Sequence, residues 1–363
     1  MTEPDPAPAP APASAGSPAS SAELSAGPAP SPAPSPATPV ATELPLIAIV
    51  GEPQSARALA RAWAGEGGTV RMLCPNEKNS KEFLASLITT GLPAEAVARV
   101  TIVRGSVVSP ADLEALFAGA EGGAFLSPVG PEGRTWRSET HLEDLGRVTE
   151  AAAKVKVSRF AYLSTLAADS QSRVRCLREA GAAEKLVTGA AMTDYSLRAG
   201  VLIGRGDGFL VRIARQAISL GPFAVVWGYG DTPFQTIHED DLGLCLARCL
   251  APVSALRAGT YCVSEKEQVN MLDLVDRVAA KLGRSKVKLH IPLFVLVLLA
   301  SLRKLLHSKT EPAFRERLQL QWVGIVTARN DLPLLLGTGY APKSIGEAIH
   351  DALRAAGLAS TTN

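Results

Sequence analysis

Metal ligands and disulfide partners are scarce in this sequence. The 363 residues include five cysteines and five histidines, no two cysteines have CxxC spacing, and no two histidines have ligand spacing. Cys245 and Cys249 lie one helical turn apart, but the leucines around them indicate a core position. His141 is expected on a helix surface and His238 in a packed position. No metal site is therefore predicted, and without an evident secretion signal the simplest interpretation is reduced thiols in the cytoplasm.

Strong charge of either sign is also missing. The formal net charge is +2, and residues 1–44 carry four acidic and no basic residues, so the remainder carries about +6. A nucleic-acid-binding domain concentrates far more positive charge on one stripe or face. Nucleic acid is therefore excluded as a partner.

The first 44 residues lack aromatic side chains, lysine and arginine, yet they hold 12 of the 26 prolines. Such a segment cannot bury enough apolar surface to offset the entropy that it would lose on folding. Residues 1–44 are therefore predicted to be a disordered or polyproline-like tail, and 359–363 a short disordered end. A targeting role is not expected, because residues 1–44 contain neither an apolar h-region nor a basic n-region.

No hydrophobic run is long enough to cross a membrane. The stretch IPLFVLVLLASL at 291–302 would be about 18 Å long as a helix, whereas a spanning helix needs roughly 30 Å. Lys286 and Lys288 precede it, and Arg303 and Lys304 follow it. Two interpretations stay open: a buried helix of a small lobe, or a helix on the inner face of a membrane with its lysines toward anionic headgroups.

From Leu46 onward, short apolar runs alternate with amphipathic stretches. Strands without a polar face that alternate with helices are typical of a parallel sheet covered on both sides. The predicted fold class is therefore α/β, a doubly wound parallel sheet. Strands are predicted at 46–50, 69–73, 98–107, 123–128, 159–165 and 193–200, and helices at 56–65, 81–91, 110–119, 139–155 and 172–190.

After Gly204 the alternation is looser, which indicates a small C-terminal α/β lobe on the end of the sheet. The predicted domains are a dinucleotide-binding core at 45–205 and a lobe at 206–358. Within the lobe, helices are predicted near 207–220, 240–250, 270–282, 312–323 and 344–356, and strands at 234–238 and 259–263.

The turn after the first predicted strand bears most directly on function. It lies in LIAIVGEPQSARALARAWAG. A dinucleotide-binding turn needs three glycines, for a tight strand exit, for close approach of the pyrophosphate, and for packing of the helix on the strand. Gly51 fills the first position, but Gln54 and Arg57 stand at the other two. We expect Gln54 to occupy space that a phosphate would need, and Arg57 to point away from the sheet. The N–H groups at the helix N-terminus would still attract a phosphate, so binding is weakened and not abolished.

Several later segments carry a wider resemblance. VSRFAYLSTLAAD, TDYSLRAGVLIGRGDGF and PFQTIHEDDLG are similar to the fifth strand, the strand that follows it and the Val-His-Val-x-Asp-Val segment of extended and atypical short-chain dehydrogenases/reductases. GTYCVSEKEQVNMLDLVDRVAAKLGR resembles a late strand and helix of the same superfamily. The resemblance covers residues 46–358 and is greatest to the NmrA-like group, in particular to the Rossmann-type accessory subunit of respiratory complex I and its bacterial homologues. It implies an NAD(P)-binding Rossmann fold.

Active members of this superfamily use a tyrosine and a lysine four residues apart on the helix after the fifth strand. In SRVRCLREAGAAEKLV these positions fall on Cys176 and Ala180, and none of the five tyrosines in the chain has a lysine four residues later. Cys176 is either a thiolate near Arg175 or Arg178 or a buried structural cysteine, and the second interpretation is preferred. No catalytic residue is therefore predicted.

The other positions that the family uses for its cofactor are only partly filled. The second strand ends in Cys74 and Pro75, which are neither the acid that selects NAD nor the arginine that selects NADP, and Gly105 is followed by serine instead of aspartate. Ser164 matches a serine that touches substrate or cofactor, or it caps backbone at the strand end. Binding of NADP(H) or NAD(H) is therefore predicted to be weak or lost. The residues predicted to line the cofactor site are Gly51, Gln54, Ser55, Ala56, Ser106, Val107, Leu126, Ser127 and Ser164.

Losses at so many points favour a fold kept for binding or scaffolding. The predicted function is a non-catalytic accessory or regulatory subunit that acts with a protein partner in the cytoplasm, with or without peripheral contact to the membrane through 291–302. Two alternatives stay open. One is an NAD(P)-dependent oxidoreductase or epimerase with unorthodox catalytic residues, and the other is an NmrA-like redox-sensing regulator that binds NADP(H) and a protein partner.

Overall fold

A computed structural model of the chain describes residues 44–126, 140–190, 192–206, 208–252, 254–292, 294–295 and 323–358. The predicted tail at 1–44 and the predicted helix near 312–323 lie outside the described residues except for Leu44 and Val323. Ser127 and the end at 359–363 lie wholly outside them. The apolar stretch 291–302 is described only in its first few positions.

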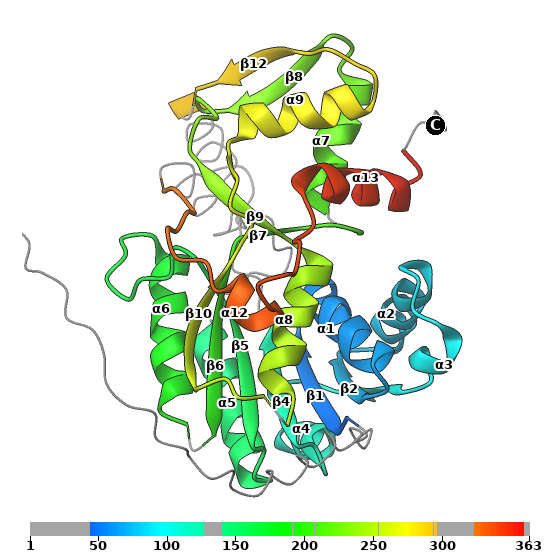
Figure 1. Cartoon of the computed structure of the whole chain (residues 1–363), viewed down its shortest axis with the longest axis vertical. Helices are drawn as coiled ribbons and strands as arrows, with labels where there is room; N and C mark the ends of the chain where they lie inside the picture. Colours follow the sequence, from blue (N-terminus) through cyan, green and yellow to red (C-terminus); the bar gives the residue numbers. More distant parts are fainter. Residues whose placement is uncertain are drawn as a thin grey trace, which may run out of the picture. The chain divides into compact units, whose positions relative to one another are not determined.

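A seven-stranded sheet forms the centre of the fold, in the order β10–β6–β5–β4–β1–β2–β3 (Figure 1). All its neighbouring strands run parallel. The winding reverses between β1 and β4, the point at which open sheets of this kind bind ligands. The predicted doubly wound α/β fold is confirmed. The strands are β1 (Leu46–Gly51), β2 (Thr69–Cys74), β3 (Val100–Arg104), β4 (Gly122–Leu126), β5 (Arg159–Thr165), β6 (Thr193–Ala199) and β10 (Gly259–Val263).

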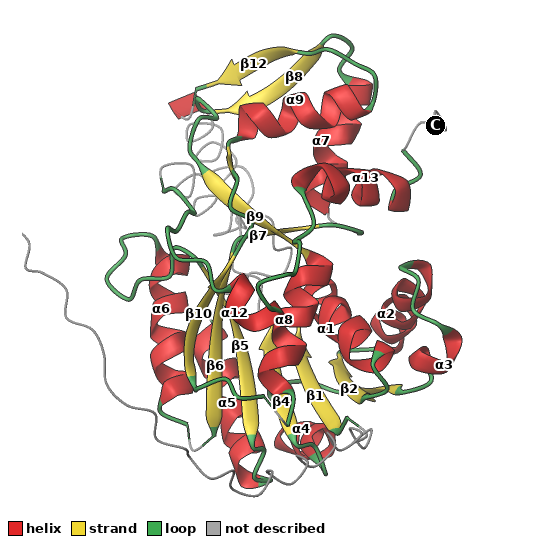
Figure 2. Ribbon diagram, viewed as in Figure 1, coloured by secondary structure: helices red, strands yellow, loops and turns green. Residues whose placement is uncertain are grey.

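Helices cover both faces of this sheet (Figure 2). Each presents apolar side chains three or four residues apart to the sheet, as Leu145, Val148 and Ala152 do in α5. One face carries α1 (Pro53–Gly65), α2 (Glu77–Thr89), α3 (Ala94–Val97), α8 (Glu239–Leu250) and α12 (Leu332–Leu336). The other face carries α4 (Pro110–Phe117), α5 (His141–Lys154) and α6 (Arg175–Thr188).

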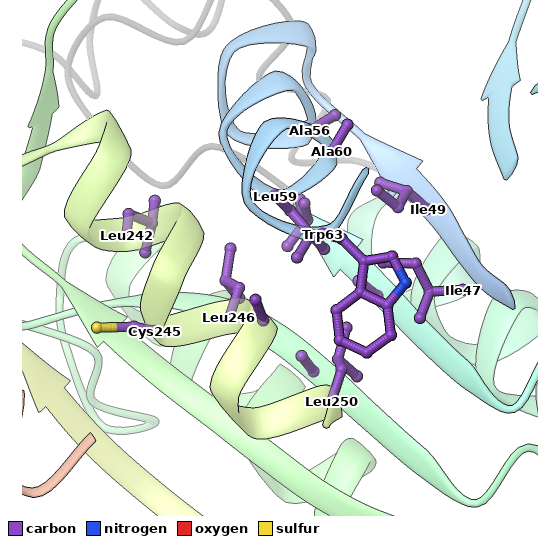
Figure 3. Close-up of a cluster of buried hydrophobic side chains, with 14 of the residues drawn as sticks. Ile47, Ile49, Ala56, Leu59, Ala60, Trp63, Leu242, Cys245, Leu246 and Leu250 are labelled. Carbon is purple, nitrogen blue, oxygen red and sulfur yellow. The ribbon is translucent and has the colours of Figure 1, made fainter. Parts of the chain in front are cut away.

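Helices α1 and α8 lie in close contact on the first face (Figure 3). A side chain at Gly243 of α8 would place its Cβ 2.3 Å from the carbonyl oxygen of Ala58 in α1, so this contact requires glycine. Trp63 of α1 lies between Ile47 of β1 and Leu250 of α8, and all three belong to one buried cluster. The first helix of the chain is thus packed against a helix from its second half.

A second apolar core lies beyond the main sheet (Figure 1). It is formed by α7 (Gly208–Ser219), α9 (Met271–Lys281), α13 (Ile345–Ala355) and a two-stranded parallel sheet of β8 (Phe223–Trp227) and β12 (Val287–Ile291). A three-stranded sheet, β11 (Gln268–Val269), β9 (Phe234–His238) and β7 (Val201–Ile203), lies between this core and the main sheet.

Six of the described elements are absent from the sequence prediction, namely α3, β7, β8, β11, β12 and α12. None is longer than five residues, so their hydrophobic patterns are too short to be distinguished from loops. The strand β12 ends at Ile291, where the apolar stretch 291–302 begins. Among the described residues, no helix combines the length and the apolarity that crossing a membrane requires.

Candidate functional site

The turn between β1 and α1 is tied to the end of the neighbouring strand β4. Gly51 has a φ of +153°, and a Cβ there would lie 2.1 Å from the carbonyl oxygen of Leu126. That oxygen accepts the backbone N–H of Glu52 at 2.8 Å. The hydroxyl of Ser55 donates to the carbonyl oxygens of Leu126 and Glu52 at 3.4 and 3.2 Å. Three predicted cofactor residues, Gly51, Ser55 and Leu126, are thus brought together at the switch point.

Gln54 and Ala56 lie in the first turn of α1 and differ in their surroundings. Ala56 is buried in the core between α1 and the sheet, and its N–H donates to the carbonyl oxygen of Glu52 at 3.0 Å. Gln54 is half-buried, and its amide nitrogen is buried without a hydrogen-bond acceptor in the described part of the chain. The N-terminus of a helix is the positive end of its dipole. Gln54 therefore holds an unused donor where an anion is favoured.

Arg57 is buried where α1 packs against the start of α8. Only 6% of the residue is exposed. Its guanidinium donates to Glu239 Oε2 at 2.9 Å and to the carbonyl oxygen of Arg205. Arg57, which stands where the third glycine is expected, therefore links α1 to the start of α8 and to the segment after β7. The sequence gives no sign of this pairing, because 182 residues separate Arg57 from Glu239.

Arg57 and Glu239 belong to a network of buried and half-buried charges. Arg205 pairs with both Glu239 and Asp240. Burial raises the pKa of Glu239, and the charge of Arg57 partly offsets this effect. Burial also acts to raise the pKa of Asp240, but hydrogen bonds from Arg205 and Lys343 outweigh it, and this pKa lies well below its usual value. Opposite charges therefore hold α1, α8 and the segment after β7 together.

Three groups in this network have the spacing of metal ligands. A ring nitrogen of His238 and carboxylate oxygens of Asp240 and Asp351 lie within 4.8 Å of one another. Asp240 already pairs with Arg61 at 2.7 Å and with Lys343 at 2.6 Å. Burial lowers the pKa of His238 to about 4, and its Nδ1 accepts the N–H of Asp240 at the start of α8. Because the protein's own cations neutralise these carboxylates, the arrangement does not favour a metal ion.

The two positions of the catalytic pair lie in the core. Cys176 is buried in a small cluster with Val174 and Leu177, and Ala180 is fully buried on the same helix, α6. Burial of the thiol agrees with the interpretation of Cys176 as a structural cysteine. Neither position presents an acid or a base to solvent.

Ser164, at the end of β5, is bonded to a buried carboxylate. Its hydroxyl donates to Glu184 Oε1 at 2.5 Å, and Arg198 of β6 donates to both oxygens of Glu184 at 2.8 and 2.6 Å. The hydrogen bond that Arg198 donates to Glu184 is also the largest cause that raises the pKa of Arg198. Sequence reasoning missed this group, although Glu184 stands one helical turn after Ala180 and so on the same face of α6.

Ser106 and Val107 directly follow β3, at the same edge of the sheet as the turn after β1. The N–H of Ser106 donates to Asp112 Oδ2 at 2.9 Å, and a Cβ at Gly105 would lie 2.4 Å from that oxygen. The superfamily pattern has an aspartate directly after this glycine. In this chain, Asp112 of α4 brings a carboxylate to the same place beside Gly105. At the end of β2, Cys74 is buried, and burial raises the pKa of its thiol.

His141 is buried, so its predicted place on a helix surface is wrong. Its Nε2 lies 3.1 Å from the hydroxyl of Tyr162, and its ring packs edge-on against Phe125 at 5.5 Å between centroids. Burial lowers the pKa of His141 to about 4, against a smaller opposite effect of Asp144. Burial also raises the pKa of Tyr162 far above its usual value. Both rings are therefore neutral at neutral pH.

We expect protonation at His141 to destabilise the fold. Its folded pKa of about 4 is below the ordinary 6.5, so the unfolded chain binds the proton first and stability falls as the pH drops from about 6.5 to about 4. The change His141→Phe should therefore flatten the loss of unfolding free energy between about pH 7 and pH 5, by up to about 2 kcal/mol. Urea unfolding across this range measures it. Equal slopes for variant and wild type would contradict the prediction.

No family model matches the chain, and no curated protein matches its sequence significantly. Many solved structures are similar in fold. The Citrobacter sp. triphenylmethane reductase complexed with NADP(H) has a TM-score of 0.60 at 16% identity, over 85% of this chain and 99% of that one. The NADPH-dependent quinone oxidoreductase QOR2 from Escherichia coli, complexed with NADPH, has a TM-score of 0.59 at 15% identity, over 84% and 98%.

The Bordetella bronchiseptica enzyme WbmH in complex with NAD+ has a TM-score of 0.60 at 15% identity, over 86% of this chain and 98% of that one. At identities this low, the TM-scores establish a shared fold and nothing beyond it. That fold is consistent with the superfamily that the sequence resembles.

Proposed function

We propose that this protein is a dinucleotide-binding Rossmann protein without tyrosine-dependent catalysis. It acts in the cytoplasm as an accessory or regulatory subunit, in complex with a protein partner. The burial of Cys176 and Ala180 on α6 carries the proposal. Proton transfer to a substrate requires a titratable side chain within hydrogen-bond reach of it. Here one position offers a methyl group, and the other offers a thiol in an apolar cluster.

The surroundings of the pair support the same conclusion. Ser164 is bonded to Glu184, and Glu184 is neutralised by Arg198, so this serine and this carboxylate are engaged with each other. Tyr162 is fully buried on β5, and its hydroxyl contacts His141. These groups stabilise the fold around α6 and do not present an acid or base to a ligand.

The cofactor that we propose is NADP(H) or NAD(H), bound weakly. Three solved structures of the same fold hold NADP(H), NADPH and NAD+. The turn at Gly51 keeps the close approach to β4 that the fold needs. Weak binding is expected because Cys74, at the end of β2, offers the ribose neither an acid nor a cation.

We expect purified protein to show no turnover with NAD(H) or NADP(H) on a panel of alcohols, ketones, quinones and nucleotide sugars. The physical reason is the absence of a proton donor at the α6 positions. Absorbance at the reduced nicotinamide band measures it. Turnover that survives repurification and disappears in Cys176→Ala would contradict the proposal and favour an oxidoreductase with unorthodox residues.

The change Gln54→Gly should strengthen dinucleotide binding by roughly tenfold, about 1.4 kcal/mol. It removes side-chain bulk where the backbone must meet the pyrophosphate, and it breaks no hydrogen bond of the Gln54 amide nitrogen. Calorimetric titration with NADPH and NADH measures the effect. Gln216→Gly, in α7 of the second core, is the matched control and should leave affinity unchanged. Tight wild-type binding that Gln54→Gly does not improve would show that the glutamine is part of a working site.

The accessory role is tested in the native host. The tagged full-length chain should co-purify with a partner in constant stoichiometry through two successive columns, and deletion of its gene should reduce the activity of that partner. A chain that elutes by itself at every step would contradict the accessory role and leave the question of cofactor binding unaffected.

A further inference from the structure

The two-stranded sheet of β8 and β12 has one buried side and one exposed side. Ala224 and Val226 of β8 are buried in the second apolar core. Successive strand residues point to opposite sides, so Phe223 of β8 and Val287 and Leu289 of β12 lie on the other side. These three are 41%, 58% and 45% exposed. A solvent-facing side of a sheet normally carries polar residues, and this one is apolar.

The polar residues of β12 point toward its own lobe. Lys288 and His290 are paired in register with Ala224 and Val226, which places them on that side of the sheet, where Lys288 is half-buried and His290 stays exposed. There Lys288 forms an ion pair with Asp276 of α9 at 2.5 Å. In β12 the apolar residues therefore lie on the outer side of the sheet and the polar residues on the inner side, which is the reverse of the usual arrangement. Exposed apolar surface of this kind marks a contact with a protein or a membrane.

Basic residues border the exposed side. Arg284 donates to the carbonyl oxygen of Ile218 at 3.2 Å, and Lys286 donates to that of Gly221, so both lie beside the link between α7 and β8. Ile218, in the last turn of α7, and Leu220, on this link, are exposed apolar residues as well. In sequence, residues 277–310 contain eight lysines and arginines and no acidic residue. Among the described residues, Arg284 and Lys286 thus make this border of the apolar surface positive.

We propose that this surface docks on an anionic membrane. The β8–β12 face consists of Phe223, Val287 and Leu289, with Arg284 and Lys286 at its border. Apolar side chains would enter the headgroup boundary, and the cations would lie at the level of the phosphates. The chain also continues from β12 into the apolar sequence 291–302.

Charge distinguishes a membrane from a second copy of the chain. Two copies joined through the β8–β12 face would bring the same basic border against itself, and like charges across an interface are unfavourable. An anionic lipid surface attracts this border by about 1 kcal/mol for each lysine or arginine close to it. The inference is independent of whether the protein binds a dinucleotide.

Vesicle sedimentation with the full-length chain tests the proposal. The probes are phosphatidylcholine vesicles with and without about 30% phosphatidylglycerol, at low and high salt. The double variant Val287→Thr with Leu289→Thr removes apolar surface and keeps residues that favour or tolerate strands. The control is Ile88→Thr with Val108→Thr, since these residues are 60% and 63% exposed and lie outside the face.

Wild type and the control should bind the anionic vesicles in low salt, and the double variant should bind at least about tenfold more weakly. Near-ultraviolet circular dichroism verifies that both variants are folded. The proposal would be overturned if wild type did not bind anionic vesicles. It would also be overturned by a folded double variant that binds as wild type does, since contact would then lie elsewhere. A third outcome would assign the face to a second copy of the chain and overturn the proposal. In it, wild type does not bind vesicles and is a dimer in sedimentation velocity, whereas the double variant is a monomer.

Discussion

Replacement of Arg57 by leucine should lower the free energy of unfolding by about 3–5 kcal/mol, because it leaves the buried carboxylate of Glu239 without its nearest cation. Helix propensity alone would make a substitution at this position cost no more than about 1 kcal/mol. The ion pair at 2.9 Å reverses that expectation. Urea unfolding followed by tryptophan fluorescence measures the change.

Two further variants make this test specific. Arg104→Leu removes an exposed arginine whose nearest acidic partner, Glu77, is 3.9 Å away, and should shift stability by no more than about 0.5 kcal/mol. The double change Arg57→Leu with Glu239→Leu should recover much of the loss, since it leaves no unpaired charge between these two positions. Unfolding of Arg57→Leu at the wild-type midpoint would show that the pair contributes nothing.

Replacement of Trp63 by alanine should cost about 3–5 kcal/mol, the usual range for a large aromatic side chain in a core. Trp63 is almost fully buried, and its indole N–H donates to the carbonyl oxygen of Pro45 at 2.9 Å. A Cβ at Gly68 would lie 2.3 Å from its ring, so the ring is enclosed on that side as well. Thermal unfolding and urea unfolding both measure the loss.

Trp63→Phe separates the two contributions of this side chain. Phenylalanine keeps most of the apolar packing and loses the hydrogen bond, so it should cost clearly less than alanine. The carbonyl of the half-buried Pro45 would then lose its indole partner, which costs about 1 kcal/mol. Equal stability of the alanine variant and wild type would contradict the assignment of Trp63 to the core.

The main sheet was predictable because its strands and helices are long enough to show their periods. Strands such as β1 are buried on both sides, and a helix such as α5 repeats its apolar residues every three or four positions. The strands β8 and β12 were not predictable in the same way. Each has five residues, and β12 presents its apolar residues outward, which a pattern cannot reveal without its neighbours.

The candidate site was predictable where it depends on local sequence. Gly51, Ser55 and Leu126 meet at the end of β1 because β1 and its parallel neighbour β4 end at the same edge of the sheet. Charged partners from distant segments were not predictable. Glu239 meets Arg57 only because the chain folds back on itself over 182 residues, whereas Asp112 accepts the N–H of Ser106 from six residues further along the chain.

The contact between Gly243 and Ala58 also has a consequence for synthesis of the chain on the ribosome. Helix α1 cannot complete its packing until α8 has been translated, 185 residues later by subtraction of the two positions. At about 5–20 residues per second this delay is roughly 10–40 s. During that interval Leu59 and Trp63, which α8 later covers, would be open to solvent and to other nascent chains. We therefore expect the order of translation to leave this face of the sheet uncovered, although six of its seven strands precede α8 in the chain.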